Sequence, residues 1–248
     1  MASLARMIPT ALDDLGRDEP TKREQDHRYA TYCAKRIAED EVLGAGGTIA
    51  RLAAAGIEVT VTIVTRGQPP MFSEEHVRCG QAEVKAAHNL LGVRETILLN
   101  QPAAGLNSVP YAYLNRAFGQ MVRDLQPATM LLPFIGDMHL DHQLVFLSSL
   151  VAVRPHSPVY PAQIYCYETL SETNWNAPFA TASFTPNVYV DISSTLDQKL
   201  DAMRYFRSQL FEFPHERSID ALRALAMSWG STVHRQAAEA FVAVRQVV

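Results

Sequence analysis

The sequence has few cysteines, and their scarcity excludes two kinds of stabilising site. Cys33, Cys79 and Cys166 are the three cysteines among 248 residues, and no two of them form a CxxC pair. A thiolate zinc site or a disulfide framework needs more cysteines or closer spacing. We therefore expect a chain without disulfides in a reducing compartment, which predicts a cytoplasmic location.

The chain also lacks a surplus of positive charge. Its 22 Lys and Arg residues are outnumbered by 26 Asp and Glu residues, which gives a net charge of −4. Proteins that bind nucleic acid or an anionic membrane through charge usually show the opposite balance. No nucleic-acid partner is expected.

Long apolar runs are missing as well. No stretch approaches the roughly 18 apolar residues of a transmembrane helix, so no membrane span is predicted. Residues 1–27 lack an apolar segment followed by a small-residue cleavage site, and we expect them to form a polar, partly helical extension. No repeat or Gly/Ser linker divides residues 28–248, which are expected to form one domain with a sizeable core.

The fingerprint GxGxxG is absent, which argues against a nucleotide-binding oxidoreductase. The glycine-rich stretch GAGG at 44–47 lies one turn inside an expected helix. A phosphate-binding loop would precede the helix instead. The stretch is therefore interpreted as a place where a helix packs closely on a sheet.

Strand and helix patterns alternate along the rest of the chain. Apolar, β-branched segments predict strands at 28–34, 58–65, 95–100, 128–134, 163–168 and 187–193. Helical periodicity and capping residues predict helices at 42–56, 73–93, 111–127, 141–155, 195–209 and 218–246. This alternation predicts a doubly wound α/β fold with a mainly parallel sheet and helices on both faces.

Polar residues gather after two of the expected strands. Glu39, Asp40 and Glu41 follow the first strand, and PFIGDMHLDHQ at 133–143 follows the fourth. Ligands of such sheets bind at the carboxyl ends of the strands. The two segments are therefore candidates for a shared site.

The second segment has the residue types of a metal site. His139 and His142 are three residues apart and are interleaved with Asp137 and Asp141. Imidazole and carboxylate groups suit zinc and similar divalent ions. The alternative is a solvated helix start with an aspartate as its N-cap. The acids at 39–41 also have a simpler interpretation, since carboxylates are favoured in the first turn of any helix.

Several motifs, in order, resemble the LmbE-like or PIG-L family of zinc-dependent N-acetylglucosaminyl deacetylases. They are EDEVLGAGGTIARLAAAGIEVTVTIVTRG, AEVKAAHNLLGV, GDMHLDHQLV, YETLSETNW, FTPNVYVDIS, SQLFEFPHERS and AAEAF. The resemblance covers about residue 30 to the C-terminus. It implies a Rossmann-like fold and hydrolytic removal of an acyl group, usually acetyl, from an amino sugar or related amide.

The resemblance also implies roles for single residues, and one of them departs from the family. The family motif His-Pro-Asp-Asp-Glu reads IAEDE here. Asp40 and His142 match two of the three metal ligands, whereas Ile37 replaces the first histidine and cannot bind a metal. Glu39 replaces the aspartate that acts as general base, and Ala38 replaces the proline.

Three replacements for the lost ligand are open. Glu39 could bind the metal and leave the base role to Asp137 or a water. His139 could join His142 as a ligand. A residue of the extension, His27 or Asp26, could reach the site. The remaining alternative is a decayed metal site on a fold that binds without catalysing.

Further candidates border the same motifs. His215 resembles a family histidine near the substrate and could polarise the scissile carbonyl, or it could cap a helix. Arg66 and Arg78 could contact sugar hydroxyls or a phosphate. Glu172, like Glu168, could shape the pocket rim or cap a helix. Trp175 could stack on a sugar ring or fill the core of a loop.

Two main hypotheses follow. In the first, the chain is a metal-dependent amide hydrolase whose cofactor is zinc or another divalent ion. Glu39 would then act as base, and His139 would stabilise the oxyanion. In the second, it is an impaired relative that binds a carbohydrate without a metal. The partner in either case is a small N-acylated amino sugar or glycoconjugate, and the resemblance implies a homo-oligomer.

Overall fold

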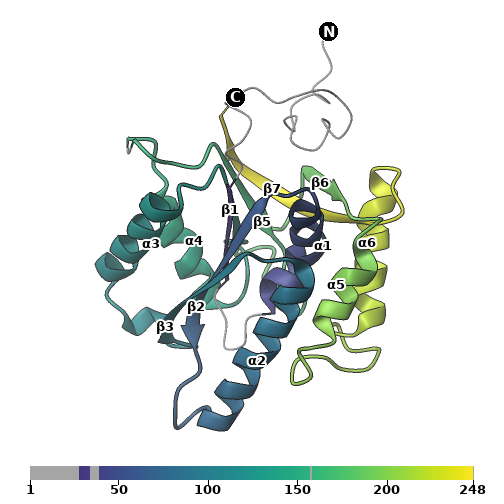
Figure 1. Ribbon diagram of the computed structural model, residues 1–248, viewed down its shortest axis with the longest axis horizontal. Helices are drawn as coiled ribbons and strands as arrows, with labels where there is room; N and C mark the ends of the chain where they lie inside the picture. The colour runs from purple at the N-terminus through teal and green to yellow at the C-terminus, as the bar shows by residue number, and fades with distance from the viewer. Residues whose placement is uncertain (1–27, 34–38, 157, 248) are drawn as a thin grey trace.

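A seven-stranded sheet forms the centre of the protein (Figure 1). The computed structural model describes residues 28–33, 39–156 and 158–247, with the side chains of 28–33 left out. The strand order is β3-β2-β1-β4-β5-β7-β6. The strands are β1 (Arg28–Cys33), β2 (Glu58–Arg66), β3 (Glu95–Pro102), β4 (Thr129–Pro133), β5 (Gln163–Tyr167), β6 (Val188–Asp191) and β7 (Ala238–Gln246).

The sheet is mainly parallel, as the alternating pattern predicts. The pairs β2–β3, β1–β2, β1–β4 and β4–β5 are parallel, whereas β7 runs antiparallel to both β5 and β6. Tyr29 of β1 lies opposite Thr129 of β4. The chain reverses its winding direction between these two strands, and their carboxyl ends form the crevice where open α/β sheets bind ligands.

Helices cover both faces of the sheet. They are α1 (Asp40–Ala54), α2 (Glu74–Leu91), α3 (Tyr111–Leu125), α4 (Leu140–Ala152), α5 (Leu196–Met203) and α6 (Ile219–Thr232), with short 3₁₀ helices at Leu106–Ser108 and Thr173–Trp175. Figure 1 shows α3 and α4 on one face and α1, α2, α5 and α6 on the other. No helix among the described residues combines the length and the apolar character that crossing a bilayer requires.

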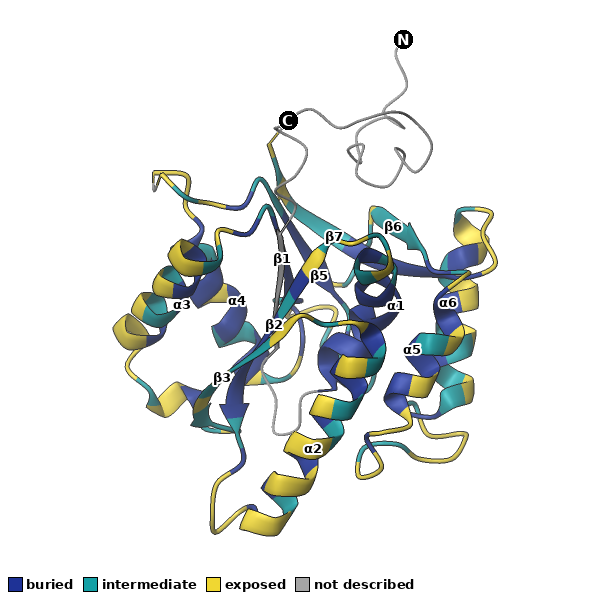
Figure 2. Ribbon diagram, viewed as in Figure 1, coloured by how far each residue is buried: buried dark blue, intermediate teal, exposed yellow. Residues whose placement is uncertain are grey.

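Each face has its own apolar core. One core joins Ile49 of α1 to Val61 of β2 and Phe206 near α5, and the other joins Phe118 of α3 to Leu132 of β4. Helix α1 is buried almost all round, whereas α2 exposes a broad outer stripe (Figure 2). The helix that begins at Asp40 is thus clamped between the sheet and other helices.

A buried carboxylate of the last strand holds α1 in this position. Glu239 of β7 accepts hydrogen bonds from the backbone N–H groups of Gly47 and Thr48 at 2.9 and 2.7 Å. Its Oε1 also lies 2.6 Å from Nζ of Lys199 in α5. One side chain therefore ties α1, α5 and β7 together.

The prediction of a single helix over 218–246 is wrong. Helix α6 ends at Thr232, His234 has a positive φ of 59°, and residues from Ala238 onward form β7. The segment AEAFVAVRQ contains good helix formers, but it pairs with strands on both sides. Tertiary pairing overrides local propensity here.

Gly44, the first glycine of the stretch at 44–47, packs closely on the sheet, in agreement with the prediction. A Cβ at Gly44 would overlap the Tyr167 ring of β5. We expect Gly44→Ala to lower the free energy of unfolding by about 1–3 kcal/mol, because the core would have to shift. Denaturant titration measures this change.

Gly119 in α3 provides the matched control for Gly44. The nearest neighbour of its added Cβ is the end of the flexible Arg123 side chain, at 3.4 Å. Gly119→Ala should raise stability by roughly 0.5–1 kcal/mol, since Ala favours the helix. Equal effects at the two positions would contradict the packing argument.

Candidate active site

The three acids at the start of α1 are fully buried, and each faces a different partner. Glu39 is paired with Arg217, Asp40 with His142 and Glu41 with His88. Acids that only complement a helix dipole are normally solvated. The acidic turn is therefore part of a built interior site.

Asp40 and His142 meet across the crevice between β1 and β4. Oδ2 of Asp40 lies 3.0 Å from Nε2 of His142, and both side chains are 0% exposed. Asp40 is the first residue of α1, and His142 lies in the first turn of α4. The fold thus brings together two residues that lie 102 positions apart in the chain.

The other ring nitrogen of His142 faces two more carboxylates. Its Nδ1 lies 3.1 Å from Oδ2 of Asp137 and 3.5 Å from Oε2 of Glu172. Asp137 is fixed on both oxygens, because it accepts hydrogen bonds from the His139 backbone N–H at 2.8 Å and the Thr173 hydroxyl at 3.0 Å. Asp137 therefore orients the His142 ring.

This surplus of carboxylates affects the protonation of His142. Burial lowers the pKa of the imidazole, but the charges and hydrogen bonds of Asp40 and Asp137 outweigh burial and raise it to about 9. Without another cation, the ring therefore carries a proton at neutral pH. A bound metal ion would replace that proton and supply the missing positive charge.

Arg217 is a central residue of the site that the sequence interpretation missed. This buried guanidinium lies 2.6 Å from Oε1 of Glu39 and 3.0 Å from Oε1 of Glu172. It also donates to the Ser171 hydroxyl at 2.6 Å and the Gln209 side chain at 3.0 Å. The only signal in the sequence is its place in PHERS, where His215 drew attention instead.

His139 and Asp141 shape the start of α4. His139 is the N-cap, and its Nδ1 accepts a hydrogen bond from the Asp141 backbone N–H at 3.2 Å. The rings of His139 and His142 stack with centroids 5.0 Å apart. Asp141 accepts hydrogen bonds from the backbone N–H groups of Ala104 and Leu106, so it fixes a neighbouring loop.

The chemistry of these side chains fits a divalent cation. Among the described residues, Asp40, His142 and Glu172 are buried, and one potential ligand atom of each lies within 4.8 Å of the others. Four buried carboxylates surround one guanidinium and one imidazole; they belong to Glu39, Asp40, Asp137 and Glu172. Buried charges need compensation, and oxygen and imidazole ligands together suit zinc-like ions.

A cavity of about 420 Å³ adjoins this cluster. It is lined by Ala104, Asn107, Met138, His139, Leu140, Asp141, Ser171 and Glu172. Glu172 and His139 therefore reach both the cluster and the cavity. A small substrate in this space would lie next to the candidate metal ligands.

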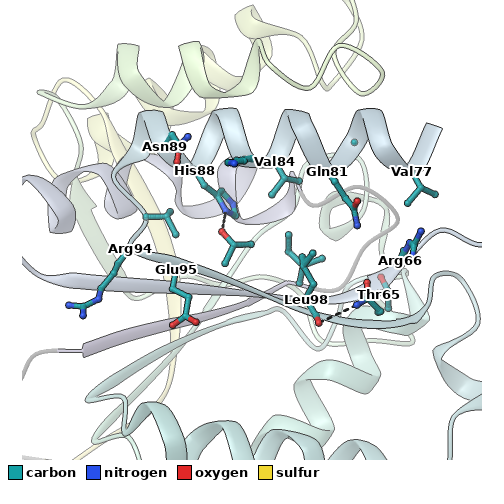
Figure 3. A pocket seen from close by; sticks show the side chains of 16 residues that line it. Thr65, Arg66, Val77, Gln81, Val84, His88, Asn89, Arg94, Glu95 and Leu98 are labelled. Atoms are coloured by element: carbon teal, nitrogen blue, oxygen red, sulfur yellow. Dashed lines mark hydrogen bonds between the residues drawn. The ribbon is translucent and has the colours of Figure 1, made fainter. Parts of the chain in front are cut away.

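Both arginine candidates lie outside the cluster. Arg78 is exposed on α2. Arg66 lines a different cavity of about 390 Å³ between α2 and the β2–β3 edge. Figure 3 shows Val77, Gln81 and Val84 of α2 over Leu98, with Arg66 at one end and Arg94 at the other. None of the carboxylate cluster lines this second cavity.

The remaining candidates have partners of their own. His215 is exposed, packs against Phe211, and accepts a hydrogen bond from the Arg217 backbone N–H at 3.0 Å. Trp175 is 64% exposed, and its Nε1 donates to Glu216. Glu168 accepts from Nε1 of Trp229 at 2.5 Å.

Four residues named in the sequence analysis lie outside the described residues. They are Asp26, His27, Ile37 and Ala38. The proposed replacement of the lost ligand by the extension therefore stays a prediction.

Known proteins share both the sequence pattern and the fold. Residues 38–153 match the PIG-L family model, described as GlcNAc-PI de-N-acetylase. The uncharacterized deacetylase YaiS of Escherichia coli K12 is 28% identical over 175 residues, 68% of this chain and 86% of that protein. Diacetylchitobiose deacetylase of Thermococcus kodakarensis is 26% identical over 217 residues, 83% and 79% of the two chains.

A solved structure agrees with these matches. The conserved protein TT1542 of Thermus thermophilus is 26% identical, with a TM-score of 0.71 over 89% of this chain and 96% of that chain. The matched segment contains Asp40, the strands β2 to β4, and the HLDH turn. The match to the PIG-L family model over residues 38–153 therefore agrees with the resemblance that the sequence motifs show.

Proposed function

We propose that this protein is a metal-dependent hydrolase that removes an acyl group, most simply acetyl, from an N-acylated amino sugar or related amide. The observation that carries the proposal is the buried contact of Asp40 with His142 beside an open cavity. The PIG-L match and the similarity to a diacetylchitobiose deacetylase support the same reaction class.

Asp40 and His142 would hold the metal, with Glu172 as the nearest carboxylate for a third position. A divalent ion bound there would activate a water and polarise the acyl carbonyl. Asp137 faces Nδ1 of His142 and so directs Nε2 toward Asp40. Such carboxylate–histidine pairs fix the ring and raise its strength as a ligand. Glu172, as the third ligand, would partly replace the family histidine that Ile37 has displaced.

Glu39 and His139 are the residues proposed to move a proton and to stabilise charge. Arg217 holds one oxygen of Glu39, which fixes the orientation of the proposed general base. Nδ1 of His139 accepts a backbone hydrogen bond, so its neutral ring carries the proton on Nε2. That N–H could donate to the oxyanion that develops on the acyl carbonyl. His215 contacts the backbone of Arg217 and is proposed to act only at the rim.

The test combines metal analysis with product detection. Protein purified without chelator should contain about one divalent ion per chain and should release acetate from N,N′-diacetylchitobiose. Treatment with a chelator should abolish acetate release, and adding zinc should restore it. Metal far below one equivalent with no acetate release would overturn the proposal. Sugar binding under those conditions would identify a non-catalytic carbohydrate-binding protein.

The altered motif gives a second measurement. We expect Ile37→His combined with Glu39→Asp to tighten metal binding more than roughly 100-fold. Groups that only support a ligand typically change the affinity by about 10–100-fold, and this variant adds a side chain that binds the metal directly. Chelator competition measures the affinity. Unchanged affinity would show that the native site is already complete without a ligand at position 37.

A further inference from the structure

A second contact network lies directly beside the catalytic residues and holds an exposed tryptophan. Trp175 ends the 3₁₀ helix Thr173–Trp175, and its backbone N–H donates to the carbonyl of Glu172 at 3.2 Å. Its ring is 64% exposed. Yet its Nε1 is bound by Glu216, whose other oxygen accepts from the Asn174 side chain at 2.6 Å.

Glu216 therefore fixes an aromatic face that remains open to solvent. Partial burial raises the pKa of Glu216, but the hydrogen bonds from Trp175 and Asn174 outweigh it and keep the pKa below its usual value, so the carboxylate stays ionised. A ring that is already held loses little conformational freedom when a ligand packs on it. Tryptophan with its N–H satisfied offers a large apolar surface for such contact.

The Trp175 ring is connected to the cavity through neighbouring residues. Glu216 precedes Arg217, which holds Glu39 and Glu172, so adjacent residues fix both the catalytic carboxylates and the tryptophan. Ser171 and Glu172 line the cavity, but Trp175 does not. The Asn174 side chain accepts a hydrogen bond from the backbone N–H of Ser171 at 2.8 Å, so the network of Trp175, Asn174 and Glu216 is joined to the cavity lining.

We propose that Trp175 is a stacking platform for a second ring, and that Glu216 is its positioning residue. This rests on the proposed function. The preferred substrates are then N-acylated amino sugars joined to another sugar or ring, and free monosaccharides are poorer. The cavity takes the acylated sugar, and the exposed tryptophan face takes its neighbour.

A comparison of two substrates tests this platform. The ratio of kcat/KM for N,N′-diacetylchitobiose to that for N-acetylglucosamine should fall about fivefold to tenfold in Trp175→Ala, because one aromatic contact is lost. The loss should be mainly in KM. Glu216→Ala should lower the same ratio less, and Glu216→Gln, which keeps an acceptor oxygen, should partly restore it. Tyr113→Ala, which removes an aromatic 54% exposed on α3, is the control and should leave the ratio unchanged.

Tryptophan fluorescence separates this proposal from the proposed function. Trp175 and Trp229 are the two tryptophans. Diacetylchitobiose should change the emission of the unaltered protein and not that of Trp175→Phe. If the emission changes without acetate release, the platform stands and the hydrolase proposal fails. Acetate release with the same substrate ratio in Trp175→Ala would overturn the platform alone.

Discussion

Asp40→Asn and His142→Gln should each lower metal affinity by more than about a hundredfold, with a parallel loss of deacetylation. Even the loss of a group that only supports a ligand costs about 10–100-fold, and these two side chains would contact the ion directly. Both are 0% exposed and 3.0 Å apart. Chelator competition gives the affinity, and acetate release gives the activity.

A graded series makes this result specific. Asp137→Asn should lose only about 10–100-fold in metal affinity, since Asp137 is expected to orient His142 without binding the ion. Asp201→Asn removes an exposed carboxylate paired with Arg204 and should change neither quantity. Circular dichroism checks that each variant is folded. If Asp40→Asn binds the metal as tightly as Asp201→Asn does, the proposed ligand set is wrong.

Arg217→Met should produce the largest loss of stability of any variant considered. The buried guanidinium compensates Glu39 and Glu172 at 2.6 and 3.0 Å. Removing one partner of a buried ion pair usually costs about 3–5 kcal/mol, because a buried charge is left without compensation. Activity should fall as well, since Glu39 would lose the contact that orients it. Denaturant titration of the metal-free protein measures the stability.

Two further variants isolate the origin of this loss. Adding Glu172→Gln to Arg217→Met should recover part of the stability, because one uncompensated carboxylate is then removed. Arg223→Met is the control, because Arg223 forms an exposed pair with Asp197 at 2.9 Å and should cost at most about 1 kcal/mol. A loss at Arg217 no larger than that at Arg223 would refute the role assigned to the buried guanidinium.

The pair of Asp40 and His142 could be predicted from the sequence, because open α/β sheets bind their ligands at the carboxyl ends of the strands. Polar residues after the first and fourth strands were expected at one sheet edge, and the structure places Asp40 against His142 there. The distant contacts could not be found in this way. Arg217 reaches Glu39 across 178 positions, and no local pattern distinguishes it from a surface arginine.

Two other outcomes show the limits of local patterns. Arg66 stands at the carboxyl end of the apolar strand β2, but its side chain lines the cavity beside α2. The segment 238–246 is apolar and rich in alanine, which suits a helix or a buried strand equally well. Its partners β5 and β6 decide the outcome, and they are specified elsewhere in the chain.

The position of Glu239 has a consequence for synthesis on the ribosome. Helix α1 is translated well before Glu239, because Thr48 and Glu239 lie 191 positions apart in the chain. The Glu239 carboxylate nevertheless binds Gly47, Thr48 and Lys199. A growing chain therefore cannot form these contacts with the helix that starts at Asp40 until residue 239 has left the exit tunnel. Nascent chains stalled before residue 239 should leave that helix open to protease attack, and the final strand should protect it.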